Sequence, residues 1–137
     1  MSALDVRSLS KADFAVRPHC IHHVNFPITD VERTKAWYGK VFGMKHVDVS
    51  HLTNTKVLLM SRGHFELHFT PLDAPHRMAP FHFAIELEDW DAFMKHLDTI
   101  GVRHTKPVER PQNQYKFCYI HDPDGNMVEL TYHADRP

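Results

Sequence analysis

Residues 22–43, HHVNFPITDVERTKAWYGKVFG, join a short strand directly to a helix and decide how the chain folds. The first part alternates apolar and polar side chains, as in a strand with one buried face. Asp30 follows as a typical N-terminal helix cap, and Gly43 is a typical residue for a helix end. The stretch therefore predicts a strand and then a helix over 31–42.

The same arrangement recurs in the second half of the chain, where residues 81–101 read FHFAIELEDWDAFMKHLDTIG. Asp89 takes the place of the helix cap, Gly101 ends the helix, and the apolar positions between them follow the spacing of an amphipathic helix over 90–100. In both copies a histidine lies seven residues before the capping aspartate. The chain is thus predicted to contain two copies of one unit, a strand, a helix and then several strands.

Each copy also closes on a similar motif, GHFEL in the first and GNMVEL in the second. From His23 to Glu66 is 43 residues, and from His82 to Glu129 is 47. The second motif begins in the sequence DPDG, which predicts a tight turn with proline second and glycine fourth. Such a turn fixes the register of the strand that carries Glu129.

The repeat suggests where the domain divides. We expect one domain over 20–137, in which module 1 spans 20–70 and module 2 spans 81–133. Three prolines between the modules mark a linker over 71–80. Residues 1–19 lie outside the repeat and are interpreted as an N-terminal extension. With 42% hydrophobic residues, the chain can bury one core.

The composition argues against several classes of partner. Sixteen basic and seventeen acidic residues give a net charge of -1 without a run of Lys or Arg, so neither nucleic acid nor an anionic membrane is expected to bind. The longest aliphatic run, 57–60, is too short to span a bilayer, and the N-terminus lacks the apolar core of a signal peptide. Cys20 and Cys118 lack the spacing of a disulfide framework or zinc knuckle. We expect a soluble, cytoplasmic protein.

Side chains of a strand point alternately to opposite faces, so each predicted strand can be divided into two faces. In the strands that open and close the two copies, apolar residues share one face and the other face carries His23, Glu66, His82 and Glu129. A single glutamate in such a place is ordinarily a polar residue on the open side of a sheet. Four in matching places predict that the two sheets curl so that these side chains converge. His22 falls on the apolar face and is expected to be a hydrogen-bonded core histidine.

Two imidazoles and two carboxylates form a donor set that suits a divalent ion such as Zn, Ni, Co, Mn or Fe(II). The set balances the charge of the ion and leaves positions open for water or substrate. We therefore predict a metal-binding site. His68 shares the face of Glu66 two residues along, so it is an alternative ligand in place of Glu66 or a residue that approaches the substrate.

The segments HHVNFPITDVERTKAWYGKVFGM and YIHDPDGNMVEL resemble the vicinal oxygen chelate superfamily, which includes glyoxalase I, bleomycin-resistance proteins and extradiol dioxygenases. The resemblance covers about residues 20–133. It implies an α+β fold in which two βαβββ modules form an open, eight-stranded, barrel-like sheet with the helices outside. It also implies metal ligands in the first and last strand of each module, and these fall on the same four residues.

The resemblance further implies an enzyme. Members of the glyoxalase type use four protein ligands, whereas ring-cleaving dioxygenases resemble a site with two histidines and one carboxylate, so Glu66 favours the former. Our leading hypothesis is a metal-dependent, glyoxalase-like lyase or isomerase that acts on a small oxygenated substrate by Lewis-acid catalysis, with Glu66 or Glu129 as base. The alternatives are an Fe(II) extradiol-type dioxygenase and a metal-free drug-binding protein of the bleomycin-resistance kind.

A substrate pocket is predicted on the same concave face, lined by Asn25, His68, Tyr115, Phe117 and Tyr119. The places where glutathione-dependent relatives hold the tripeptide carry Pro27 and Thr70 here, so a standard glutathione lyase is not expected. The resemblance also implies a homodimer. Whether the four ligands meet within one chain or between two protomers is left open, because relatives do both.

Overall fold

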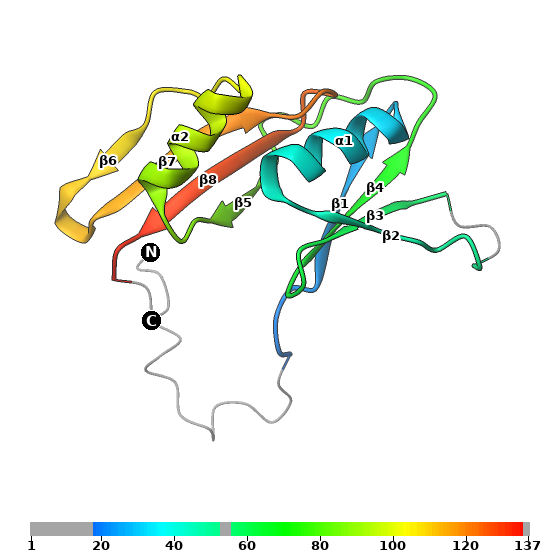
Figure 1. Cartoon of the computed structure of the whole chain (residues 1–137), viewed down its shortest axis with the longest axis horizontal. Helices are drawn as coiled ribbons and strands as arrows, with labels where there is room; N and C mark the ends of the chain where they lie inside the picture. The colour runs from blue at the N-terminus through cyan, green and yellow to red at the C-terminus, as the bar shows by residue number, and fades with distance from the viewer. Residues whose placement is uncertain (1–17, 53–55, 136–137) are drawn as a thin grey trace.

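The computed structural model describes residues 18–52 and 56–135, and residues 1–17 of the expected N-terminal extension lie outside this part. Each half has the order strand, helix and three strands (Figure 1). The first half contains β1 (His23–Ile28), α1 (Val31–Phe42), β2 (Lys45–Val47), β3 (Leu58–Ser61) and β4 (Glu66–Pro71). The second contains β5 (His82–Glu86), α2 (Trp90–Ile100), β6 (Val108–Arg110), a 3-10 turn (Pro111–Asn113), β7 (Tyr115–His121) and β8 (Met127–His133).

Both helices begin and end at the residues that the sequence predicts. The Asp30 side chain accepts a hydrogen bond from the backbone N–H of Arg33 at 2.9 Å, and Asp89 accepts one from Ala92 at 3.0 Å. At the other ends, Gly43 and Gly101 have φ of 65° and 74°, a left-handed conformation that glycine adopts without strain. The predicted caps and helix boundaries are confirmed.

The strands form two four-stranded sheets, in the orders β1-β4-β3-β2 and β5-β8-β7-β6. In each sheet the first and last strands of the module run parallel as neighbours, and the other neighbours are antiparallel. The sheets do not close into a barrel, so the predicted α+β fold with an open eight-stranded arrangement is confirmed. β4 continues through Pro71, one residue into the expected linker.

One hydrophobic core lies under both helices. α1 crosses the first sheet and α2 the second, next to each other in Figure 1. Between the modules, the Phe42 and Phe93 rings stack at 5.8 Å, and Phe26 meets Phe83 edge to face at 5.1 Å. The strands bury the face that the sequence pattern assigned to the core, with Phe26, Ile28, Leu67, Phe69, Val128 and Leu130 at 7% exposure or less. None of the helices in the described residues is long and apolar enough to cross a membrane.

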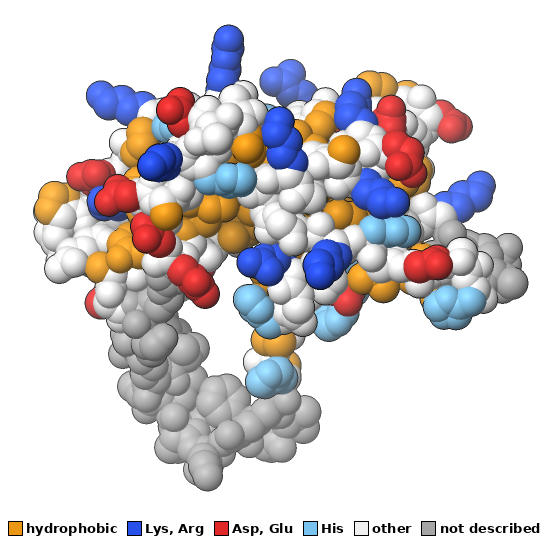
Figure 2. Space-filling model, in the orientation of Figure 1, with side chains coloured by type: hydrophobic (Ala, Val, Ile, Leu, Met, Phe, Trp, Pro, Cys, Tyr) orange, Lys and Arg blue, Asp and Glu red, His pale blue; other side chains and the backbone are white. Residues whose placement is uncertain are grey.

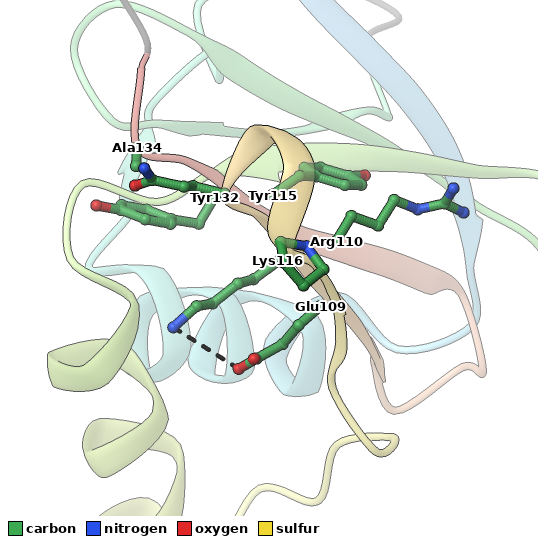
Figure 3. Close-up of a pocket in the computed structure, with 8 residues that line it drawn as sticks. Glu109, Arg110, Tyr115, Lys116, Tyr132 and Ala134 are labelled. Atoms are coloured by element: carbon green, nitrogen blue, oxygen red, sulfur yellow. Dashed lines mark ion pairs between the residues drawn. The ribbon is translucent and has the colours of Figure 1, made fainter.

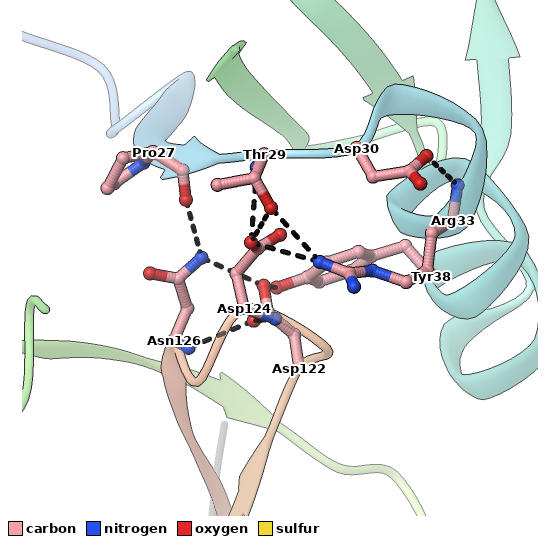
Figure 4. A network of polar contacts seen from close by, with 8 residues as sticks. All are labelled: Pro27, Thr29, Asp30, Arg33, Tyr38, Asp122, Asp124 and Asn126. Carbon is pink, nitrogen blue, oxygen red and sulfur yellow. Dashed lines mark hydrogen bonds and ion pairs between the residues drawn. The ribbon is translucent and has the colours of Figure 1, made fainter. Parts of the chain in front are cut away.

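The turn before β8 joins the two modules through buried polar contacts (Figure 4). Tyr38 of α1 donates its hydroxyl hydrogen to Asp122 Oδ2 at 2.8 Å, and Asn126 Nδ2 donates to the Pro27 carbonyl at 2.9 Å. All three side chains in these bonds are at least 96% buried. Buried polar groups without such partners would be costly, so the bonds favour one placement of β8 relative to β1.

The same turn makes a second, more exposed set of contacts. Asp124 Oδ1 accepts hydrogen bonds from the Thr29 hydroxyl at 2.6 Å and from Arg33 at 3.1 Å. The turn itself closes with a hydrogen bond from Gly125 N–H to the Asp122 carbonyl, and Gly125 has φ of 83°. The predicted DPDG turn is thus confirmed, and it also anchors the strand that carries Glu129 to the first module.

The expectation for His22 is wrong. His22 is exposed, and its Nδ1 lies 3.0 Å from Nδ1 of His23. β1 begins only at His23, so the alternation of the strand does not extend back to His22. A residue outside the strand is not held to either face of the sheet.

Candidate functional site

The predicted ligands form two His–Glu pairs, one on each sheet. In the first sheet His23 lies directly beside Glu66 in the parallel pair of β1 and β4. In the second sheet Glu129 lies beside Ala84, and His82 lies beside the residue two positions before Glu129. The two pairs therefore lie on equivalent strands of the two sheets, but the histidine and the glutamate are directly opposite each other only in the first.

Contacts in the first pair centre on His68. Its Nε2 donates to Glu66 Oε2 at 2.7 Å, and its ring stacks on the His23 ring with centroids 3.7 Å apart and planes 15° apart. Among the residues that the structure describes, no hydrogen bond or ion pair joins His23 directly to Glu66. His68 links them instead. Histidine side chains gather near the end of the molecule where β1 begins (Figure 2).

The second pair is in direct contact. His82 Nε2 lies 3.7 Å from Glu129 Oε1. His82 Nδ1 lies 2.8 Å from the Pro80 carbonyl oxygen, which can only accept, so Nδ1 carries the proton. In a neutral ring this leaves the lone pair on Nε2, the nitrogen near the carboxylate. A histidine held through one nitrogen by a backbone carbonyl is the usual arrangement of a metal ligand.

Tyr119 contacts both members of the second pair. Its hydroxyl donates to Glu129 Oε1 at 3.1 Å, and its ring lies edge-on to His82 with centroids 5.4 Å apart. Partial burial, the hydrogen bond to Glu129 and the negative charge of that carboxylate raise the pKa of Tyr119 above its ordinary value. The hydroxyl is therefore a protonated donor at neutral pH.

A pocket of about 430 Å³ lies between the modules and brings three of the four residues to one surface. It is lined by His23, Glu66 and His82, and otherwise mainly by apolar side chains, Ile21, Val24, Phe65, Leu67, Phe83, Ala84 and Ile85. Within residues 18–52 and 56–135, no three His, Cys, Asp or Glu side chains are grouped so that they could hold a metal ion. The described chain thus carries two His–Glu pairs, His23 with Glu66 and His82 with Glu129.

The other residues expected around the substrate lie in different places. Asn25 is exposed and accepts a hydrogen bond from the Thr70 hydroxyl at 2.8 Å. On β7, the rings of Tyr115 and Phe117 stack at 5.2 Å, and those of Phe117 and Tyr119 meet edge to face at 6.0 Å. The three rings form a row that leads away from Glu129 toward the end of the second sheet.

Tyr115, at the far end of this row, lines a separate pocket of about 440 Å³ (Figure 3). In the close-up, Lys116 and Glu109 form an ion pair at 3.7 Å on one side of the strands, and Arg110 and Tyr115 point to the other. The Arg110 guanidinium lies 6.0 Å from the Phe117 ring centroid. The structure does not bring all five predicted pocket residues into one cavity, and their role stays a prediction.

Sequence reasoning missed two features of this region. The Pro80 carbonyl that orients His82 is a backbone group, so no side-chain pattern marks it. The second is the ion pair of His133, at the end of β8, with Glu86 of β5 at 2.9 Å. By alternation His133 and Glu86 lie on the same face of the sheet as Glu129, and that signal was available in the sequence.

The fold agrees with comparisons to known proteins. The family model of the glyoxalase/bleomycin resistance protein/dioxygenase superfamily matches residues 20–130. The chain belongs to this superfamily. The superfamily includes many enzymes, commonly uses divalent metals, binds small-molecule substrates and often forms dimers.

Individual relatives within the superfamily are distant. The chain is 28% identical over 120 residues to the uncharacterized protein YaeR of Escherichia coli (strain K12), covering 80% of this chain and 93% of YaeR. A putative glyoxalase family protein from Bacillus anthracis superposes with a TM-score of 0.75 at 22% identity, over 88% of this chain and 99% of that one. A lactoylglutathione lyase from Agrobacterium tumefaciens gives a TM-score of 0.67 at 20% identity, over 85% and 95% of the two chains. At these identities the two structures show the shared fold.

Proposed function

We propose that this protein is a metal-dependent lyase or isomerase of the glyoxalase type, acting on a small oxygenated substrate. The observation that carries the proposal is the pair of half-sites, each with one histidine and one glutamate on equivalent strands. The second half-site supports metal binding most directly, because His82 is bonded through Nδ1 to a carbonyl and directs Nε2 toward Glu129. Two neutral imidazoles and two carboxylates together match the preferences of Ni, Co, Zn, Mn and Fe(II).

The complete site forms between two copies of the chain, in our proposal. His23 and Glu66 of one copy combine with His82 and Glu129 of the other. This arrangement is supported by the pocket within one chain, which His23, Glu66 and His82 line but Glu129 does not. It is also supported by Ile21 and Phe81, large apolar residues near the two histidines that are 80% and 73% exposed. A second copy would cover such side chains, and a two-fold dimer would complete both sites at once.

The residues around the half-sites suggest how the chain would assist a reaction. A bound divalent ion supplies Lewis acidity, which lowers the energy of negative charge that develops on substrate oxygens. In this proposal Glu66 or Glu129 takes a proton from the substrate and returns it. Val24, Leu67 and Phe83 give the pocket apolar walls, and electrostatic interactions are stronger beside such surfaces than in bulk water.

Anaerobic titration of the purified protein with Ni(II), Co(II), Zn(II), Mn(II) and Fe(II) tests the proposal. We expect tight binding of one ion per chain. Glu129→Gln removes a charged ligand and should lower the affinity by more than the roughly 10–100-fold loss typical of outer partners. Glu109→Gln is the matched control, because Glu109 is exposed and its ion pair among the described residues is with Lys116 on the neighbouring strand.

Other outcomes assign the protein differently. Oxygen uptake with catechols in the presence of Fe(II) would indicate the extradiol-type dioxygenase. Binding of small molecules without any metal uptake would contradict both enzyme hypotheses and indicate the metal-free binding protein. If Glu66→Gln keeps full metal affinity while His68→Ala loses it, His68 replaces Glu66 as the ligand.

A further inference from the structure

Each half-site contains one additional side chain that contacts both its histidine and its glutamate. In the first it is His68, which stacks on His23 at 3.7 Å and donates to Glu66 at 2.7 Å. In the second it is Tyr119, which lies edge-on to His82 at 5.4 Å and donates to Glu129 at 3.1 Å. Each pair thus has one neighbour whose hydrogen bond reaches the carboxylate while its ring packs against the imidazole.

His68 and Tyr119, called the bridging residues below, do not occupy corresponding positions in the two copies of the repeat. His68 lies on β4, two residues beyond Glu66 on the same strand. Tyr119 lies on β7, directly opposite Glu129 in the antiparallel pair of β7 and β8. The same pair of contacts is therefore reached from two different strands, which sequence repetition alone does not produce.

We propose that His68 and Tyr119 are positioning residues, each of which holds one histidine and one glutamate of a half-site in the orientation that binds metal. This inference rests on the proposed function. Outer partners of metal ligands fix the orientation of the ligands, and their loss typically weakens metal binding by roughly 10–100-fold.

The surroundings favour such a role. The side chains of His68, Glu66 and Glu129 are 15%, 24% and 16% exposed, so their hydrogen bonds are partly shielded from water. Hydrogen bonds to an ionised carboxylate are shorter and stronger than those between neutral groups. Each bridging residue fixes its glutamate by such a bond and limits rotation of its histidine by ring contact.

Variants can separate the two contacts of each bridging residue. His68→Phe keeps a ring beside His23 and removes the donor to Glu66, whereas His68→Gln keeps an N–H donor and removes the ring. Tyr119→Phe keeps the ring beside His82 and removes the hydroxyl. The controls are His64→Phe and Tyr132→Phe. His64 lies in the turn before β4, where its ring meets Phe65, and Tyr132 lies on β8 on the opposite face from Glu129 by alternation.

The measurement is titration of the full-length variants with Co(II), read as affinity and as the visible absorption spectrum of the bound ion. We expect His68→Phe and Tyr119→Phe to bind Co(II) roughly 10–100-fold more weakly than the wild type, with a changed spectrum. His68→Gln should recover part of the loss, and both controls should match the wild type. Wild-type affinity and an unchanged spectrum in His68→Phe and Tyr119→Phe would overturn the inference.

Failure of the proposed function gives a different result. In that case the wild type takes up no Co(II), and NMR of the histidine rings in the metal-free protein decides on positioning. We expect His68→Gln to shift the His23 ring signals and Tyr119→Leu to shift those of His82, with no such shifts in the two controls. Unchanged ring signals would show that neither residue holds its histidine, and would overturn the inference independently of metal binding.

Discussion

The two modules share their order of elements and their helix caps, yet they bring histidine and glutamate together differently. In module 1, His23 lies directly beside Glu66, and a third residue fills the space between the side chains. In module 2, Glu129 is beside Ala84, which has only a methyl side chain, and His82 reaches Glu129 from two positions away. The repeat therefore keeps the histidine and the glutamate on equivalent strands, while the local register decides which residues surround each pair.

The turns that lead into the closing strands differ as well. In module 1 the turn between β3 and β4 is short, and a local hydrogen bond from Gly63 N–H to the Ser61 hydroxyl holds it. In module 2 the turn that contains Asp122 and Asn126 bonds to the other module. Only the second of these turns links the two halves of the described chain through buried polar groups. Through these bonds module 1 helps to fix the position of the strand of module 2 that carries Glu129.

The largest expected effect comes from combining the two half-sites in mixed dimers. Glu66→Gln and Glu129→Gln chains, each with its own affinity tag, are coexpressed, and dimers that carry both tags are isolated. A mixed dimer retains one site with all four ligands, so we expect about one tightly bound ion per two chains, on the basis of two-fold symmetry. Dimers of either single variant should bind weakly at both sites.

The control for this experiment is a mixed dimer in which one chain carries both substitutions. If sites are shared, neither site in that dimer is intact, whereas a site closed within one chain leaves the wild-type partner fully able to bind. Weak binding in the Glu66→Gln and Glu129→Gln mixed dimer, with tight binding in the control, would mean that each chain completes its own site.

The next largest effect concerns the contact that aligns the modules. Tyr38→Phe removes a buried hydrogen bond to Asp122 and should lower the free energy of unfolding by about 1.5–3 kcal/mol, the usual range for a bond to a charged group. Chemical denaturation measures the loss. Tyr115→Phe is the control, since its ring is partly exposed and its contacts are with other rings. Equal stability of the two variants would show that the contact between modules contributes little.

Much of this asymmetry could not be predicted from the sequence. The caps Asp30 and Gly43 and the face of each predicted ligand were predictable, because they depend on short-range patterns. Alternation has a period of two, however, so it assigns a face without choosing the partner across the strand. It could not reveal that Glu129 is offset from His82. The bond from Tyr38 to Asp122 joins residues 84 positions apart, and no local pattern marks such a partner.

A smaller effect should appear at high pH. Burial, the negative charge of Asp122 and the hydrogen bond to it raise the pKa of Tyr38 well above its ordinary value near 10. The folded state thus holds this proton more tightly than the unfolded state, so stability is unaffected below about pH 10 and falls above it. Between pH 9 and 11, wild type should lose stability more steeply than Tyr38→Phe in chemical denaturation. Parallel curves would contradict this assignment.

The smallest effect distinguishes the thiols of the two modules. Cys20, before β1, is exposed, whereas Cys118 is buried in β7 and burial raises its pKa to about 11. The thiolate is the reactive form, so at pH 8 iodoacetamide should modify Cys20 and leave Cys118 unmodified in the folded protein. Mass spectrometry of peptides measures both sites, and labelling in denaturant, where both should react, is the control. Modification of Cys118 at the rate of Cys20 would mean that β7 separates readily from its neighbouring strands. The hydrogen bond from Tyr119 on β7 to Glu129 would then often be broken.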